Sequence, residues 1–320
     1  MAFVGIHTQI KRNNRKSILL LIAFPLLILA AVFAVVFFTS FDQYGNANPD
    51  VAIDAFLQAI PFVGAVVLIW FLIAYFAHGK MIAMATKSKP LERKENMRVY
   101  NLVENLCMSV GLKMPQVRII ESDALNAFAS GLKEKDYTVT LTRGIIENLD
   151  DDELEGVIAH ELMHIRNKDV RLLVVTVVFV GIFAFVVQIA FRSFLYGNIA
   201  GGGNRRRGKD GGGGQLMIVI LIVAFVAYLI SMIFKFALSR KREYMADSGA
   251  AEMTRKPWAL ASALKKISTN HHVQVRSEEV QQMFIENTPK DTSAGLFGGL
   301  GGLFSTHPPI EKRIQFLEQF

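Results

Sequence analysis

The chain has 320 residues, which is enough for one or two domains, and 52% of them are hydrophobic. Its mean hydropathy of +0.32 and its charged fraction of 20% are unusual for a soluble globular protein and indicate membrane segments. Lys and Arg outnumber Asp and Glu by 35 to 28, but they flank apolar runs and are not interleaved with aromatic residues. We therefore expect a lipid bilayer and no nucleic acid as a partner. The single cysteine, Cys107, excludes an intrachain disulfide.

Four uncharged apolar segments are each long enough to cross a bilayer as a helix, which takes about 20 residues. They cover residues 17–41, 55–77, 172–191 and 211–234. The first pair predicts an N-terminal membrane hairpin over residues 1–78, and the second pair predicts another over residues 171–238. A Gly/Arg-rich loop at 197–214 joins the second pair and is typical of a flexible linker.

The charges beside these segments predict an orientation. Basic residues precede the first segment, and the loop after it contains Asp but no Lys or Arg. Basic residues follow again after residue 77, so the positive-inside rule places the N-terminus and this region in the cytoplasm. The basic loop 197–214 conflicts with the rule. Either the last two segments cross weakly or reversibly, or this loop overrides the charge bias.

The polar parts, 79–170 and 239–320, are expected to form one α+β domain together, since neither alone has many core positions. Short strands are predicted at 116–121, 126–130 and 137–142, with turn-prone residues between them, and we expect a small antiparallel sheet. The acidic run 150–153 then predicts the start of a helix, because carboxylates favour the positive end of a helix dipole.

That helix carries the motif H-E-x-x-H over residues 160–164. Residues four apart share a helix face, so His160 and His164 can both reach one Zn²⁺. Glu161 is turned away from that face and can approach a zinc-bound water without being a ligand. Zinc lowers the pKa of such a water towards ~7, and Glu161 can take its proton during attack on a peptide carbonyl.

A hydrolytic zinc site needs a third protein ligand, and helix geometry indicates Glu243. His164 lies eight residues before the third apolar segment, and Glu243 lies nine residues after the fourth. At 1.5 Å per residue, both side chains are expected ~12–14 Å above the same membrane surface. The alternative is a solvated glutamate paired with Arg242.

Asp247 lies four residues beyond Glu243, on the same helix face. It can accept a hydrogen bond from the ring nitrogen of His160 or His164 that does not bind the metal, which would fix the orientation of that imidazole. The alternative is an ordinary surface aspartate. His307 precedes two prolines, which predicts an extended or turning segment.

Three motifs together resemble the HtpX family of bacterial membrane zinc proteases. They are the H-E-x-x-H of residues 160–164, the E-Y-M-A-D of residues 243–247 and the S-T-H-P-P-I-E-K-R of residues 305–313, and the stretch N-A-F-A at 126–129 also matches. The resemblance implies a zincin-like catalytic domain of the gluzincin type with one Zn²⁺ per chain. It also implies a multi-pass protein of the bacterial cytoplasmic (inner) membrane, with the catalytic domain on the cytoplasmic side.

The resemblance further implies roles for individual residues. Glu243 would be the third ligand, Asp247 would support the ligand histidines, and His307 would lie near the metal and help to stabilise the oxyanion. Asn126, Ala127, Phe128 and Ala129 would form an edge strand that binds an extended substrate by β-addition. The expected substrates are misfolded or damaged membrane proteins and unfolded polypeptides.

Two alternatives remain. A CAAX-type prenyl protease is a related zinc enzyme, but that family has more membrane spans than the four predicted here. A zinc-binding membrane scaffold or regulator without hydrolysis belongs to another class. Glu161 argues against the scaffold, since purely structural zinc sites are usually closed by four protein ligands.

Overall fold

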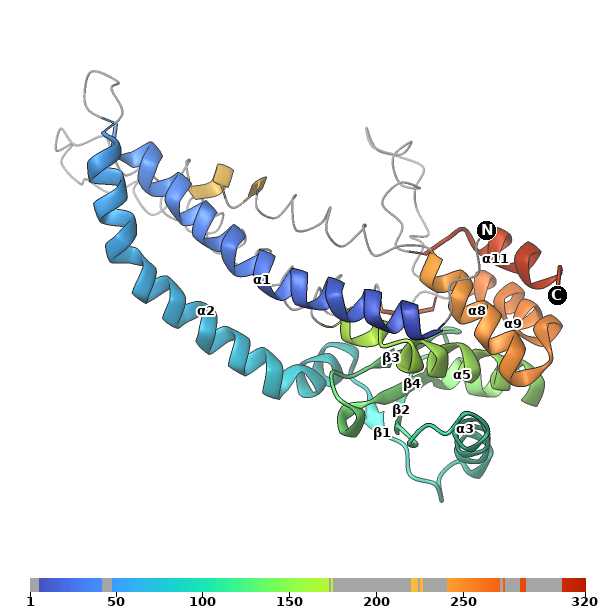
Figure 1. Cartoon of the computed structure of the whole chain (residues 1–320). Coiled ribbons are helices and arrows are strands. Elements are labelled where there is room, and N and C mark those ends of the chain that lie inside the picture. The colour runs from blue at the N-terminus through green and yellow to red at the C-terminus, as the bar shows by residue number, and fades with distance from the viewer. Residues whose placement is uncertain are drawn as a thin grey trace, which may run out of the picture. The chain divides into compact units, whose positions relative to one another are not determined.

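The computed structural model describes residues 6–41, 48–172, 174, 220–223, 225–226, 241–270, 273, 283–285 and 307–320 (Figure 1). The chain forms two compact units. One comprises Met1–Ser17, Phe76–Val175 and Phe236–Phe320, and the other comprises Ile18–Tyr75 and Thr176–Lys235. The predicted domain boundaries stay predictions, since most of residues 171–240 lie outside the described part.

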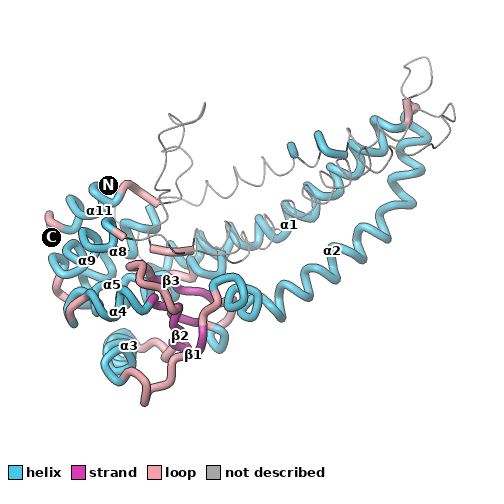
Figure 2. Tube along the Cα trace, turned by 180° about the vertical axis from the view of Figure 1, so that it is seen from behind, coloured by secondary structure: helices cyan, strands magenta, loops and turns pink. Residues whose placement is uncertain are grey.

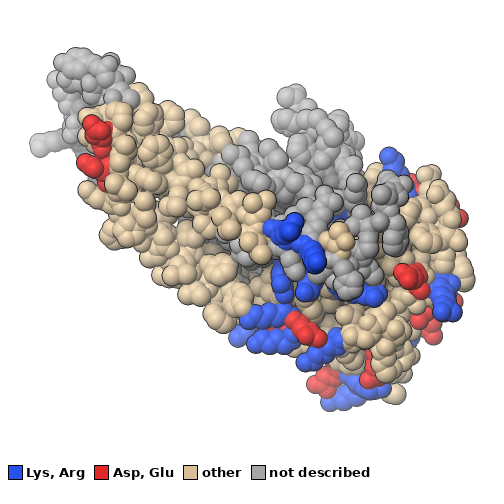
Figure 3. Space-filling view, viewed as in Figure 1, with Lys and Arg blue, Asp and Glu red and all other residues tan. Residues whose placement is uncertain are grey.

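The first two apolar segments are helical. Helix α1 covers Ile6–Thr39 and helix α2 covers Pro49–Thr86. Within them, Ile22–Thr39 and Pro49–Ile73 are long and apolar enough to cross a membrane. Phe33 of α1 packs edge-on against Phe56 of α2, with ring centroids 5.2 Å apart. The surface over the middle of α2 carries no Lys, Arg, Asp or Glu in the view of Figure 3.

The third and fourth predicted segments and the loop 197–214 lie outside the described residues, apart from a few positions. Of these segments the structure describes only residues 172, 174, 220–223 and 225–226, all helical. The prediction of four membrane helices is therefore supported for two of them.

The sheet has four strands in the order β1-β2-β4-β3. Their bounds are β1 Lys89–Pro90, β2 Gln116–Ile120, β3 Ala127–Ser130 and β4 Thr138–Thr142. The β1–β2 and β3–β4 pairs are antiparallel, but β2 and β4 are parallel. The prediction of an antiparallel sheet was therefore wrong in part. The chain leaves β2, passes to the far edge to form β3, and returns so that β4 fills the buried position between them.

The other helices of the first unit pack beside the sheet and against one another (Figure 2). They are α3 Met97–Val110, α4 Arg143–Asn148, α5 Asp151–Arg166, α8 Lys241–Thr254, α9 Pro257–Thr269 and α11 Ile310–Leu317, with a short 3-10 turn at Glu134–Asp136. Helix α5 contacts β3, β4, α3, α8 and α9, and 11 of its 16 residues are buried. It is therefore the central element of this unit.

The start of α5 is fixed by its sequence. The Asp150 carboxylate accepts a hydrogen bond from the backbone N–H of Glu153 at 2.9 Å, and the Glu153 carboxylate accepts one from the N–H of Asp150 at 3.0 Å. This capping box satisfies N–H groups that the first helical turn leaves unpaired. Further along, a Cβ at Gly156 would lie 3.1 Å from the backbone nitrogen of Leu260, so glycine lets α5 and α9 approach closely.

Candidate active site

Helix α5 brings His160 and His164 together one turn apart. Their Nε2 atoms lie 3.1 Å from each other, and the two ring planes are perpendicular. His160 is fully buried, while His164 is partly exposed. The two imidazoles therefore aim their Nε2 lone pairs at one point, as the H-E-x-x-H spacing predicts.

Glu243 on α8 reaches the same point. Its two carboxylate oxygens lie 3.7 Å from Nε2 of His160 and 3.7 Å from Nε2 of His164. Three donors placed ~2.1 Å from a tetrahedral Zn²⁺ would be separated by about 3.4 Å. The two imidazole nitrogens are 3.1 Å apart, and each lies 3.7 Å from a different oxygen of Glu243. With one ligand atom taken from each residue, the three atoms lie within 4.8 Å of one another. The donor set and its spacing thus fit a zinc ion without large rearrangement.

Carboxylates hold the other nitrogen of each imidazole. Nδ1 of His160 lies 2.9 Å from Asp247, the residue predicted to support a ligand histidine. Nδ1 of His164 lies 3.3 Å from Asp169, which the sequence analysis missed. A carboxylate that accepts the Nδ1–H leaves the Nε2 lone pair facing the site, which is how ligand histidines are oriented in metal centres.

Charged neighbours on both sides shift the pKa of His160. Burial and the positive charge of Arg313 lower its pKa, but hydrogen bonds to Asp247 and Glu243 outweigh them and raise the pKa to about 9. The carboxylates therefore favour positive charge on or beside this imidazole.

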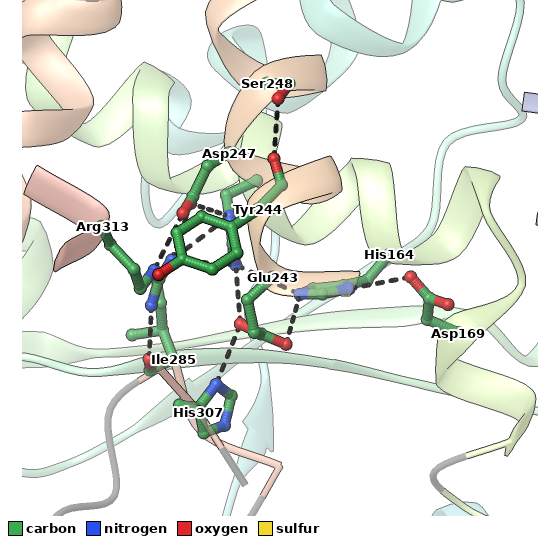
Figure 4. A network of polar contacts seen from close by, with 10 residues as sticks. His164, Asp169, Glu243, Tyr244, Asp247, Ser248, Ile285, His307 and Arg313 are labelled. Carbon is green, nitrogen blue, oxygen red and sulfur yellow. Dashed lines mark hydrogen bonds and ion pairs between the residues drawn. The ribbon is translucent and has the colours of Figure 1, made fainter. Parts of the chain in front are cut away.

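Arg313 on α11 is a second residue whose role the sequence analysis missed, and it is fully buried. Its Nε and Nη2 donate to the two oxygens of Asp247 at 3.0 and 2.8 Å, and its Nη1 donates to the carbonyl of Ile285 at 3.0 Å (Figure 4). Arg313 thus fixes the carboxylate that fixes His160. It belongs to the motif 305–313, but no spacing rule marks an arginine there as part of a metal site.

His307 lies beside Glu243, with Nδ1 2.9 Å from a carboxylate oxygen (Figure 4). Burial raises the pKa of Glu243, but His307, His164 and His160 together hold it well below its usual range. His307 is therefore placed next to the candidate ligands, as predicted. The contact is that of a group supporting Glu243, and the predicted role towards the oxyanion stays a prediction.

Glu161 is buried beside the two histidines, with a relative exposure of 2%. Burial raises the pKa of its carboxyl, and His160 and His164 partly oppose that effect. A carboxylate with a raised pKa in this position has the character of a general base that works near neutral pH.

The stretch 126–129 lies at the edge of the described sheet, as predicted. Asn126 directly precedes β3, its side-chain oxygen accepts from the N–H of Ala127 at 3.0 Å, and residues 126–129 are all buried. The edge is partly covered, because the N–H of Ile285 donates to the carbonyl of Ala127 at 2.8 Å. The substrate-binding role of these residues stays a prediction.

Two imidazoles and a carboxylate on neighbouring helices, with a glutamate beside the first histidine, define the site of a metallopeptidase. The comparisons agree. The model of peptidase family M48 matches residues 93–320. A protein described as "Protease HtpX homolog" from Bacteroides fragilis is 52% identical, with the whole of both chains covered. One of the same description from Dictyoglomus thermophilum is 36% identical over 97% of this chain and 93% of its own length.

The chain therefore belongs to peptidase family M48 and, within it, to the HtpX family of membrane metalloproteases. Among solved structures, that described as "Crystal Structure of S. mikatae Ste24p" is similar with a TM-score of 0.48 and 20% sequence identity. That likeness covers 82% of this chain and 58% of the other.

Proposed function

We propose that the protein is a zinc-dependent endopeptidase of the bacterial cytoplasmic membrane that cleaves misfolded or damaged membrane proteins at the cytoplasmic face. The observation that carries the proposal is the geometry of His160, His164 and Glu243. One ligand atom from each of the three lies within 4.8 Å of the others, which is close enough for all three to reach one zinc ion. Three protein ligands leave a fourth position open, which favours hydrolysis over a closed structural site.

In this proposal each residue of the site has a separate role in catalysis or in positioning. Bound zinc would polarise the scissile carbonyl and acidify a water molecule. Glu161 takes the proton of the attacking water and passes it to the leaving amine. Asp247 and Asp169 hold the ligand imidazoles in orientation, and Arg313 holds Asp247. His307 keeps Glu243 in place and is the group we propose to face the developing oxyanion.

A site close to the bilayer would suit a membrane-associated substrate. The apolar segments predicted before α8 and after α5 would lead towards the bilayer, and the helical rise then predicts a site ~12–18 Å above its cytoplasmic surface. An extended polypeptide could pair with the main chain of β3, with Ala127, Phe128 and Ala129 as its neighbours. Such binding uses hydrogen bonds to the substrate main chain and depends little on its side chains, which suits unfolded substrates of varied sequence.

The deciding experiment is proteolysis of casein and of a membrane substrate by the detergent-purified full chain. We expect Glu161→Gln to keep stoichiometric zinc and to lose activity by a factor on the order of 10²–10⁴. Glu155→Gln is the matched control, since Glu155 lies on the same helix and pairs with Lys256 at 3.0 Å. It should retain activity. Chelation should abolish wild-type cleavage and added zinc should restore it, whereas full activity of Glu161→Gln would overturn the proposed chemistry.

A further inference from the structure

A separate cavity lies in the same unit as the metal site, between the end of α2 and the sheet. Its volume is about 410 Å³, which is within the range of small-molecule sites. Residues from Phe76 to Ala83 of α2 form one wall, and side chains of β2, β3 and β4 form another. Of the described residues, none that belongs to the metal site lines it. The cavity therefore has no part in the chemistry proposed above.

The wall formed by the sheet is polar because the strands alternate. Thr138 and Thr140 line the cavity, whereas Val139 and Leu141 point to the opposite face and are fully buried. The parallel register places Arg118 of β2 beside Thr140. Buried hydroxyls need hydrogen-bond partners, so this face of the sheet favours a polar group in the cavity.

The hydroxyls at the base of the cavity can donate hydrogen bonds. Ser130 and Thr138 are at most 9% exposed, and their hydroxyl oxygens lie 2.5 Å apart. One hydrogen joins this pair, so the other hydroxyl hydrogen remains for a second acceptor. Thr140 is 1% exposed, and its hydroxyl makes no hydrogen bond to any residue that the structure describes. These groups can therefore serve an acceptor inside the cavity.

The charges around the cavity favour an anion. Arg118, Lys80 and Lys135 line it, against a single carboxylate, Asp136, and in the described part of the chain none of the three forms an ion pair. Arg118 is anchored by Ser88, to which its Nε and Nη2 donate at 3.0 and 2.6 Å. Its Nη1 makes no hydrogen bond to a described residue. In Figure 3, Lys and Arg side chains gather where α2 ends and the sheet begins.

The cavity also follows a candidate membrane span directly along the chain. The span ends at Ile73, and α2 continues without a break to Thr86. Phe76 and Ala83 follow Ile73 by three and ten residues, or about 5 and 15 Å along the helix. Headgroups occupy roughly the first 5–7 Å outside the hydrocarbon.

We propose that this cavity binds a phosphate group, and that the headgroup of an anionic phospholipid supplies it. The Arg118 guanidinium and the two lysines would neutralise the phosphate, and the threonine hydroxyls would donate to its oxygens. Basic pockets beside membrane helices recognise anionic headgroups by the same chemistry. A bound lipid would join the end of α2 to the sheet whose edge strand lies beside the metal site.

The test measures binding of dihexanoyl-phosphatidylglycerol to the detergent-purified full chain, with dihexanoyl-phosphatidylcholine and inorganic phosphate as separate probes. We expect saturable binding of the phosphatidylglycerol and clearly weaker binding of the other two. Arg118→Gln should weaken this binding at least about tenfold, because the phosphate loses a charge-assisted hydrogen bond and a positive charge beside it. The double variant Lys80→Gln/Lys135→Gln should weaken it similarly and changes only exposed side chains.

Lys113→Gln is the matched control, since Lys113 is exposed and outside the cavity. Retained zinc content shows that each variant is folded. The proposal is overturned if Lys113→Gln weakens binding as much as the double variant, because the attraction is then a general effect of charge. Inorganic phosphate that binds as tightly as the lipid would overturn the lipid source, and preferential binding of an acidic peptide would overturn the phosphate assignment.

Discussion

Replacing Arg313 by methionine should lower both the zinc affinity and the free energy of unfolding. The side chain is fully buried and donates through three nitrogens, two to Asp247 and one to the Ile285 carbonyl. Methionine fills much of the same volume but leaves Asp247 as a buried anion, with His160 as its remaining charge partner among the described residues. Removal of one member of a buried ion pair costs about 3–5 kcal/mol of unfolding free energy. Zinc affinity should fall roughly 10- to 100-fold, as when other supporting partners of ligand histidines are lost.

The assay combines zinc competition with a chelator and urea unfolding in detergent. Arg313→Lys keeps the positive charge but cannot make a bidentate contact with Asp247. Its zinc affinity and its free energy of unfolding should therefore lie between those of wild type and of Arg313→Met. Arg143→Met is the control, because Arg143 makes a similar pair with Glu121 at 2.5 and 2.8 Å but at an exposed position. Exposed pairs contribute about 0–1 kcal/mol. If Arg313→Met bound zinc like wild type, the inferred support of His160 through Asp247 would be refuted.

Two further predictions concern acid stability and membrane orientation. Burial raises the pKa of Glu153, but hydrogen bonds from Lys266, Ser262 and the Asp150 backbone outweigh it and lower the pKa. Ionised Glu153 therefore stabilises the fold fully at a pH above its unfolded-state pKa, and this stabilisation is lost as the pH falls through its lower folded-state pKa. Glu153→Gln should lower the free energy of unfolding at pH 7 but not in strong acid. A cysteine in place of Arg206, with Cys107→Ala, should react with an impermeant thiol reagent from outside intact cells, and labelling only after lysis would contradict the proposed crossing of the third and fourth segments.

Local sequence signals predicted the catalytic helix well. The spacing of His160 and His164 follows from a period of 3.6 residues, and the acidic run 150–153 follows from the helix dipole, so both signals act within one helix. Glu243 required one further step, the counting of helical rise from two apolar segments. The structure places that carboxylate against the histidines.

Features that depend on tertiary pairing were missed. The parallel pairing of β2 with β4 arises because the chain skips a position in the sheet, and short strands of similar composition do not encode that choice. Asp169 and Arg313 act through contacts that span five and 66 residues of sequence, respectively, to His164 and Asp247. Neither contact follows a helix or strand period, so only the folded structure identifies these two residues as supports of the site.

The backbone of Ile285 contacts both the edge strand and a residue of the metal site. Its N–H donates to Ala127 of β3, and its carbonyl accepts from Arg313. A polypeptide that paired with β3 at this point would compete for the Ala127 carbonyl and, by moving Ile285, would weaken its hydrogen bond with Arg313. Thermodynamic linkage then requires reciprocity. If an added strand changes the affinity for zinc by some factor, zinc must change the affinity for that strand by the same factor. Binding of a substrate strand and binding of zinc would then be two coupled equilibria.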